Sequence, residues 1–394
     1  MSNAAQRLDD LLSNDLEALK ARSLYRLRRL VDGPQGAEID IAGRRYLNFS
    51  SNDYLGLADH PALRAAVHRA LDDYGTGSGA AHLITGHTRA HAALEAELAE
   101  FVQRPRALLF SSGYLANLGV AGALLGRGDR VLEDRCNHAS LLDAGLLSGA
   151  RFSRYPHAQA SGIQWQRAQR GARTLVMTDG VFSMDGDIAP LPELARAAAA
   201  AGAFLMVDDA HGFGVLGEHG RGSLEHFSLG ITEVPVFMAT LGKALGTFGA
   251  FVAGSEALVE TLIQHARTYI YTTAAPACLA EAGRAALKLV QTESWRREHL
   301  NRLIQRFRAG AKQLNLPMLD SITAIQPLLL GKADRAVAVS EQLRDHGILT
   351  AAIRPPTVPA GSARLRITLT AAHSEQHIDR LLSALQEVMS NAVN

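Results

Sequence analysis

Short apolar runs alternate with helical patterns over most of the chain. Five runs have strand character, at 107–110, 130–132, 174–178, 204–207 and 236–240. They are continuously apolar, which is typical of strands buried on both faces of a parallel sheet. Helical spacing of apolar residues lies before and between them, at about 61–73, 91–101 and 117–125. The pattern predicts an α/β fold with a mostly parallel central sheet flanked by helices.

The two ends of the chain differ from this middle part. An amphipathic helix is expected near the N-terminus, followed by a small hairpin over 40–47 with a glycine turn. After about 292, helices over 295–313, 335–345 and from 374 are interspersed with strands near 325–330, 348–353 and 365–369. We expect three parts: an N-terminal helix and hairpin segment over 1–50, a large α/β domain over 51–291, and a smaller α+β domain over 292–394.

Composition and charge exclude several classes of function. The 394 residues carry a net charge of +1, so bulk charge indicates neither a nucleic-acid partner nor an anionic membrane. The only cysteines, Cys136 and Cys278, lie far apart and suit a reducing compartment. The N-terminus has no signal-peptide pattern, and the longest apolar stretch, 197–207, is too short to span a bilayer. These features predict a soluble cytoplasmic protein.

Polar residues follow the ends of the predicted strands, at the edge where open α/β sheets bind ligands. This group contains Ser112, His138, Ser183, Asp208, His211 and Lys243. The turn at 111–114 joins a strand to a helix N-terminus, which is a common phosphate cradle and also a common structural turn. Lys243 either opens the next helix on the surface or is a desolvated amine that can form a Schiff base.

Three alternatives compete for these residues. Residues 212–217 match G-x-G-x-x-G and follow a strand, which favours an NAD-dependent dehydrogenase, but no helix opens after the match. Asp208, Asp209 and His211 could ligate a metal, but a further ligand set is missing, so no metal is expected. A binding domain without catalysis would not explain six such groups at one edge.

Chemistry that depends on pyridoxal 5′-phosphate would give a role to each kind of residue in this polar group. This cofactor needs a Schiff-base lysine, an acid for its pyridine nitrogen, a flat partner for its ring and a cradle for its phosphate. Lys243 and Asp208 supply the first two, and His138 could be the third. The turn at Gly113, together with Thr240, could be the fourth.

The motifs resemble those of the α-oxoamine synthases, which are fold type I pyridoxal-phosphate enzymes. The similar segments are 48–56, 111–114, 179–187, 208–212, 240–243 and 352–359. The resemblance extends from about Leu24 to Leu382. It implies an acyltransferase that joins L-alanine to a pimeloyl thioester with loss of CO2, in biotin synthesis, with either coenzyme A or acyl carrier protein as the carrier. The alternative is another member, such as a glycine C-acyltransferase.

The resemblance also implies roles for single residues at the cofactor. Lys243 would form the Schiff base and act as acid and base at the substrate Cα, Asp208 would pair with the pyridinium nitrogen, and His138 would stack on the ring. The other cofactor contacts would be His211 and Ser183 to the ring oxygen, and the backbone of Gly113 and Tyr114 with the Thr240 hydroxyl to the phosphate. Thr272 and Thr273 would reach the phosphate of the other subunit, which implies a homodimer with shared active sites.

For the substrates, Arg354 would bind the amino-acid carboxylate, and Arg26, Asn52, His138 and Thr357 would line the site. Two segments depart from the family pattern. Asp179 stands where many relatives have glutamate, and Ala80-Ala81-His82 replaces a loop richer in glycine and serine. Both lie near the acyl channel in the family, so they concern recognition of the acyl group.

Overall fold

The computed structural model of the protein describes residues 3–22, 24–165 and 171–391. Its contacts divide the chain into two compact units. The first takes its residues from Met1–Ser51, Leu303–Leu369 and His373–Asn394, and the second from Asn52–Arg302 and Thr370–Ala372. Both ends of the chain thus contribute to the first unit. The division into folding domains at 1–50, 51–291 and 292–394 stays a prediction.

A seven-stranded sheet forms the centre of the second unit, with the strand order β3-β9-β8-β7-β6-β4-β5. All neighbouring pairs are parallel except the two that involve β9, so the predicted mostly parallel sheet is confirmed. The strands are β3 (Arg106–Phe110), β4 (Arg130–Asp134), β5 (Arg151–Tyr155), β6 (Thr174–Asp179), β7 (Phe204–Asp208), β8 (Val236–Thr240) and β9 (Ala250–Gly254).

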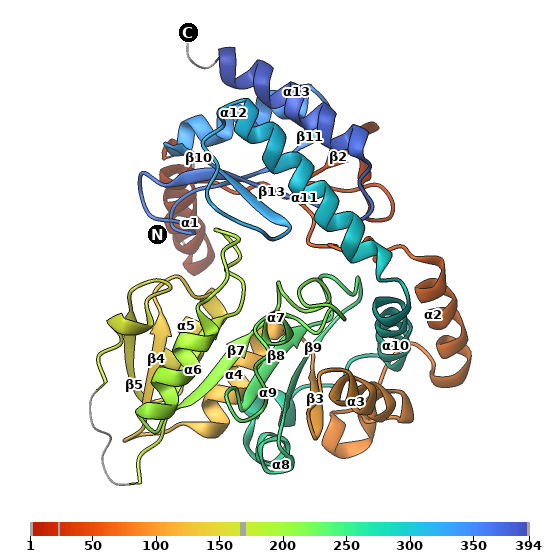
Figure 1. Cartoon of the computed structure of the whole chain (residues 1–394), viewed down its shortest axis with the longest axis vertical. Coiled ribbons are helices and arrows are strands. Elements are labelled where there is room, and N and C mark those ends of the chain that lie inside the picture. Colours follow the sequence, from red (N-terminus) through yellow and green to blue (C-terminus); the bar gives the residue numbers. More distant parts are fainter. Residues whose placement is uncertain (1–2, 23, 166–170, 392–394) are drawn as a thin grey trace. The chain divides into compact units, whose positions relative to one another are not determined.

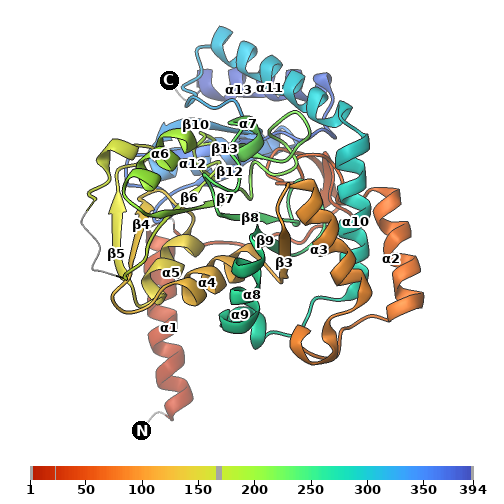
Figure 2. The ribbon, with the colours of Figure 1, turned by 60° about the horizontal axis from the view of Figure 1, so that its bottom comes forward.

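Helices cover both faces of this sheet (Figures 1 and 2). On one face, α4 (Gly113–Leu124), α5 (Ala139–Leu147) and α8 (Glu256–His265) share a buried apolar core with alternate strand residues such as Met177, Met206 and Met238. On the other face of the sheet, Phe213 packs against Phe237 of β8 and Phe251 of β9. Burial on both sides explains why these strands are continuously apolar.

The remaining elements of the second unit lie before, between and after the strands of the sheet in sequence. They are α2 (Pro61–Tyr74), the π-helix His82–Gly86, α3 (Arg89–Phe101), the 3-10 turn Ala160–Gly162, α6 (Leu191–Ala200), α7 (Ser223–His226), α9 (Arg267–Ile270), α10 (Ala277–Thr292) and the first part of α11 (Trp295–Gln313). Helix α10 packs against α2 and α3.

The first unit contains two small sheets with strand orders β1-β2-β11 and β10-β13-β12. The predicted hairpin is formed by β1 (Glu38–Ile41) and β2 (Arg44–Asn48), whose turn uses Ala42 and Gly43 at positive φ. The other elements are α1 (Ala4–Ala21), β10 (Ile325–Gly331), α12 (Ala333–Asp345), β11 (Ile348–Leu349), β12 (Ala351–Ile353), β13 (Ala363–Thr368) and α13 (Glu375–Asn391). In the parts of the chain that the structure describes, no helix is long and apolar enough to cross a membrane.

Candidate active site

The parallel strands of the large sheet bring the predicted site residues to one edge. Asp208 ends β7, Lys243 follows β8 by three residues, and His138 follows β4 by four. Because the carboxyl ends of parallel neighbours lie together, side chains far apart in sequence become neighbours here. Two hydrogen-bond chains then fix their orientations.

The first chain begins at Lys243. Its Nζ lies 2.8 Å from Nε2 of His211, and Nδ1 of the same ring lies 2.6 Å from the hydroxyl of Tyr54. The Tyr54 hydroxyl in turn donates to Oδ1 of Asn52 at 3.2 Å. Tyr54 and His211 are buried and Lys243 is half-buried, so the amine is held away from bulk water by an ordered set of partners.

The second chain begins at Asp208. Asn117 Nδ2 donates to Asp208 Oδ2 at 2.7 Å and also lies 2.8 Å from Ser140 Oγ. Ser140 Oγ is 2.7 Å from His138 Nδ1, so the carboxylate and the His138 ring are joined through two buried side chains. The backbone N–H of Ala210 donates to the other oxygen, Asp208 Oδ1, at 3.0 Å. The His138 ring itself is exposed, which suits a surface on which a flat group could stack.

Asp209 points away from this site, as strand alternation predicts. Its Oδ2 accepts the backbone N–H of Ser223 at 2.7 Å. Gly180, Gly212 and Gly222 surround the carboxylate so closely that a Cβ at any of them would overlap its oxygens. Burial raises the pKa of Asp209 to about 7. Asp209 therefore supports the turn after β7, and Asp208 is the acid at the candidate site.

Asp179 is a buried neighbour of His138. Its Oδ2 accepts the His138 backbone N–H at 2.7 Å. Burial and the nearby Asp208 charge together raise the pKa of Asp179 well above its ordinary value. The expected role of Asp179 near the acyl channel stays a prediction, whereas its support of the His138 backbone is visible in the structure.

The turn between β3 and α4 has the geometry of an anion cradle. Ser112 caps α4, because its Oγ accepts the Leu115 N–H at 3.3 Å and its carbonyl accepts the Ala116 N–H at 3.0 Å. Within the described chain, the N–H groups of Gly113 and Tyr114 have no protein acceptor. Open N–H groups at a helix N-terminus bind phosphate.

Thr240 lies at the end of β8. Its hydroxyl donates to Gly249 O at 2.9 Å and accepts the Gly242 N–H at 3.2 Å. The donor set therefore fits pyridoxal phosphate: a half-buried lysine amine, an oriented carboxylate, an exposed imidazole ring and open N–H groups at a helix start.

The remaining predicted cofactor residues lie in turns of the same unit. Ser183 is half-buried in the turn after β6. Thr272 and Thr273 follow α9, and Thr273 forms an isolated bridge with Ala81. Their contacts with a cofactor and with another subunit stay predictions.

Three predicted substrate residues belong to the first unit. Arg354 Nη2 donates to the carbonyl of Tyr25 at 2.8 Å, and the Thr357 N–H donates to the Arg354 carbonyl at 3.1 Å. Arg26, next to Tyr25, is exposed. The fold thus places Arg354 and Thr357 beside the segment that carries Arg26, and their roles toward a substrate stay predictions.

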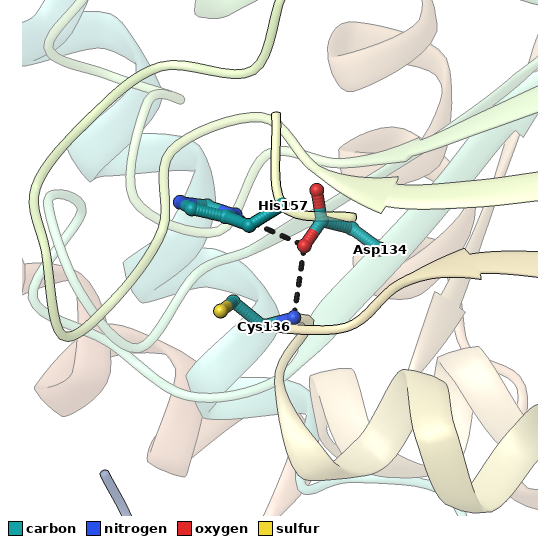
Figure 3. A group of neighbouring side chains, drawn as sticks. All are labelled: Asp134, Cys136 and His157. Atoms are coloured by element: carbon teal, nitrogen blue, oxygen red, sulfur yellow. Dashed lines mark hydrogen bonds and ion pairs between the residues drawn. The ribbon is translucent and has the colours of Figure 1, made fainter. Parts of the chain in front are cut away.

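One group of metal-ligand residues occurs in the described chain, formed by Asp134, Cys136 and His157 (Figure 3). Asp134 Oδ1 accepts the Cys136 backbone N–H at 2.8 Å and lies 3.0 Å from His157 Nδ1. His157 Nε2 lies 3.0 Å from Asp187 Oδ2. Burial lowers the pKa of His157, but hydrogen bonds to Asp134, Asp187 and Cys136 outweigh burial and raise this pKa to about 12. Both ring nitrogens then donate to carboxylates, so the ring offers no lone pair to a metal. This group anchors the turn that leads from β4 to His138.

Sequence reasoning identified Lys243, Asp208, His138 and His211 but gave no role to Tyr54, Asn117 or Ser140. Tyr54 is in the polar loop 48–56, where its aromatic character was the available signal. Its burial is visible only in the structure. Asn117 and Ser140 each lie near the start of a helix after a strand, where polar residues are usually caps. Only the folded arrangement shows that they bond across to Asp208 and His138.

The family model for aminotransferase class I and II matches residues 44–385. The chain is 63% identical over 376 residues to an 8-amino-7-oxononanoate synthase of Nitrosococcus oceani, covering 95% of this chain and 100% of that one. An 8-amino-7-oxononanoate synthase structure from Francisella tularensis is 33% identical, with a TM-score of 0.77 and coverage of 89% of this chain and 99% of that chain.

A serine palmitoyltransferase variant from S. paucimobilis, solved with a bound PLP–myriocin aldimine, is 27% identical. Its TM-score is 0.92, and the match covers 99% of each chain. The expected fold and the resemblance of the motifs are therefore confirmed. On the identity to relatives over nearly its full length and the match of the family model, the chain belongs to the class I and II aminotransferase family and, within it, to the 8-amino-7-oxononanoate synthases.

Proposed function

We propose that this chain is a pyridoxal-phosphate acyltransferase that makes 8-amino-7-oxononanoate for biotin synthesis. In the reaction, a C–C bond forms between Cα of L-alanine and the carbonyl carbon of a pimeloyl thioester, and the free thiol and CO2 leave. The observation that carries the proposal is Lys243 Nζ, 2.8 Å from His211, at the same sheet edge as Asp208 held by Asn117. The 63% identity to a synthase of this name supports the choice of substrates.

When bound, pyridoxal phosphate supplies an aldehyde for the amino group of alanine and an electron-withdrawing ring that makes the Cα proton acidic. Lys243 would hold the cofactor and would then remove the Cα proton and return one to the product. Asp208 would keep the pyridine nitrogen protonated, since a carboxylate favours the charged form of a partner. His138 would cover one face of the ring, and His211 with Ser183 would bind its oxygen.

The phosphate would be held by the N–H groups of Gly113 and Tyr114 and by the Thr240 hydroxyl. Arg354 would bind the alanine carboxylate, with Arg26, Asn52 and Thr357 at the substrates. We further propose a cytoplasmic homodimer in which Thr272 and Thr273 reach the phosphate of the other subunit. The acyl carrier is coenzyme A or acyl carrier protein.

The test is the product mass obtained from the purified enzyme. Each of alanine, glycine and serine is offered with pimeloyl-CoA, pimeloyl-acyl carrier protein and acetyl-CoA. Alanine with a pimeloyl thioester should give 8-amino-7-oxononanoate, with CO2 and thiol released in equal amounts. The Lys243→Ala variant is the control and should release neither. A faster reaction of glycine with acetyl-CoA would instead indicate a glycine C-acyltransferase.

A further inference from the structure

A cavity of about 330 Å³ lies in the second unit, between the end of α3, helix α7 and the start of β8. This volume is within the range of small-molecule sites. The cavity adjoins the amino end of β8, whereas Lys243 follows the carboxyl end of the same strand. Among the described residues, those that line it include none of the candidate active site, so the two places are separate.

Arg104 in the lining of this cavity is a buried arginine without a carboxylate partner. It is 8% exposed, and within the described chain its guanidinium forms no ion pair and one hydrogen bond, from Nη2 to the Val234 carbonyl at 3.3 Å. Its Nε is buried without an acceptor. Burial lowers the pKa of Arg104, and attraction to Glu233 opposes that shift. Arginine stays charged in proteins, and a buried charge without a close partner is costly.

A second arginine, Arg221, lines the same cavity. Its Nε is also buried without an acceptor, and its Nη1 lies 3.7 Å from Glu225 Oε1, beyond hydrogen-bond distance. Glu225 Oε2 accepts the backbone N–H groups of His219 at 3.1 Å and Arg221 at 3.0 Å, and Oε1 lies 2.6 Å from His219 Nδ1. The one carboxylate in the lining is therefore already engaged, and the two guanidinium groups leave an excess of positive charge.

Four apolar side chains also line the cavity. Leu224 and Phe237 are buried, and Val102 and Leu229 are half-buried. An apolar group placed against them would be removed from water, which favours binding. A carboxylate matches the two parallel N–H groups that a guanidinium presents, and its single charge offsets the excess of the lining. A phosphate dianion would exceed that charge and would leave the apolar walls uncovered.

We propose that this cavity binds a small organic monocarboxylate with an apolar body, and that Arg104 binds its carboxylate with Arg221 beside it. The ligand supplies the acceptor that Arg104 lacks, and the four apolar side chains enclose the rest of it. The inference is independent of the proposed reaction, because it uses no residue of the candidate active site.

The probe for the test is 4-iodobenzoate, which carries a carboxylate, an apolar ring and an iodine atom that anomalous X-ray scattering locates. Calorimetric titration of the enzyme loaded with pyridoxal phosphate should give a Kd of about 1 mM or below. Crystals soaked with the probe should show iodine in this cavity. The neutral isostere 4-iodobenzamide and inorganic phosphate should each bind at least about ten-fold more weakly.

Three arginine variants connect the binding to the cavity. Arg104→Met should weaken binding of 4-iodobenzoate about ten- to a hundred-fold, as expected for a lost hydrogen bond to a charged group, and should keep the cofactor absorbance. Arg221→Met, a change at a half-buried side chain, should weaken it about two- to ten-fold and decides the test if Arg104→Met does not fold. Arg354→Lys should bind as the wild type does, which excludes the arginine expected to hold a carboxylate at the candidate active site.

The matched control is Arg106→Met, two residues from Arg104. The Arg106 guanidinium donates to Glu256 and Glu260, and it does not line the cavity. This variant should bind the probe as the wild type does. The inference is overturned by binding at crystal concentration only, by iodine located elsewhere, by phosphate binding as tightly as the probe, or by unchanged affinity in both Arg104→Met and Arg221→Met.

Discussion

At the scale of single residues, Lys243 is distinguished from the other lysines by its neighbours. Its amine is half-buried and lies 2.8 Å from Nε2 of His211. A partly buried amine with a fixed hydrogen-bond partner is suited to forming a Schiff base. The same environment is not available to an exposed helical lysine such as Lys288.

We therefore predict that borohydride reduction of the loaded enzyme fixes the cofactor to Lys243 alone. Peptide mapping by mass spectrometry measures the result. Lys243→Ala should abolish the adduct and the absorbance of the internally bound cofactor, whereas Lys288→Ala should keep both. A reduced adduct on another lysine would show that the assignment is wrong.

The two adjacent acids, Asp208 and Asp209, should differ sharply in their effect on catalysis. Asp208 is the one that bonds Asn117 at the candidate site, while Asp209 bonds Ser223 within a cage of glycines. Asp208→Asn should still bind cofactor but lose activity by about 10²-fold or more, because a neutral amide does not favour a protonated ring nitrogen. Asp209→Asn should keep most of the activity. Steady-state kinetics and cofactor titration of both variants measure these effects. A larger loss of activity in Asp209→Asn than in Asp208→Asn would show that Asp209, and not Asp208, is the acid at the site.

Arg354 should affect alanine more than the acyl substrate. The planar guanidinium can bind a carboxylate through two parallel hydrogen bonds, and lysine cannot reproduce both. Arg354→Lys should raise the KM for alanine about ten- to a hundred-fold, corresponding to about 1.5–3 kcal/mol for a lost bond to a charged group. The KM for the thioester and the cofactor absorbance should change little. Equal increases in both KM values would indicate that Arg354 only supports the Tyr25 backbone.

At the scale of elements, the apolar pattern predicted five strands of the large sheet, including the edge strand β3, but missed β5 and β9. Residues 175–177 of β6, 205–207 of β7 and 236–239 of β8 are buried, and all of them are apolar. β5 (Arg151–Tyr155) was not predicted, because it is an edge strand with two exposed arginines. β9 (Ala250–Gly254) is buried, and it was missed because it follows a glycine-rich loop that obscured its start.

The start of α4 shows why the site could be predicted only in part. The sequence placed the helix at Asn117, whereas it begins at Gly113 with Ser112 as its cap. Glycine has low helix propensity, so the pattern gives a late start. The correct start is what turns the Gly113 and Tyr114 N–H groups into a cradle. The ends of the predicted strands thus indicated where the site residues lie. The hydrogen-bond partners of Asp208 and His211 could not be predicted, because they depend on tertiary contacts between elements distant in sequence.

Helix α3 carries a buried acid whose ionisation should alter stability. Glu95 Oε1 accepts the Leu109 N–H of β3 at 2.9 Å, and its side chain is 15% exposed. Burial raises the pKa of Glu95 to about 7 from 4.5. Between these values the folded state holds a proton that the unfolded state has released, so stability falls as pH rises through this window. The cost is complete above pH about 7 and is at most about 3 kcal/mol.

Glu95→Gln removes this cost while keeping an oxygen that accepts the Leu109 N–H. We predict that the variant has a higher Tm than the wild type at pH 8, and that the difference shrinks toward pH 5. Glu100→Gln on the same helix is the control, since Glu100 is exposed, and its Tm difference should not depend on pH. Thermal unfolding of the loaded enzyme at several pH values measures both. A difference that is constant with pH would contradict the proposed burial of charge.

At the scale of the whole molecule, the fold alone does not select the substrates. A serine palmitoyltransferase matches 99% of this chain with a TM-score of 0.92 at 27% identity. Chains with one backbone can therefore act on different amino acids, and the choice depends on side chains at the site. For this reason the proposed alanine specificity is tested by the product and not by the architecture.

The N-terminal helix α1 has an apolar stripe that is exposed in a single copy of the chain. Its apolar stripe of Leu8, Leu11, Leu12, Leu16 and Leu19 is 37–65% exposed, and no residue of the helix is buried. Burying a leucine side chain stabilises by about 1.5–3 kcal/mol. A stripe of this kind favours association, and the proposed homodimer supplies a second copy to cover it.

We predict that Leu12→Asp weakens the dimer, whereas Asn14→Asp, which adds the same charge on the opposite side of α1, does not. In a symmetric dimer each change occurs twice, so the loss is about 3 kcal/mol or more, which raises the dissociation constant at least about a hundred-fold. Sedimentation velocity over a series of protein concentrations measures the constant for each variant. If Leu12→Asp dissociates no more readily than Asn14→Asp, the stripe does not lie in the interface. A wild-type protein that is monomeric at every concentration would contradict the proposal of an active site shared between two subunits.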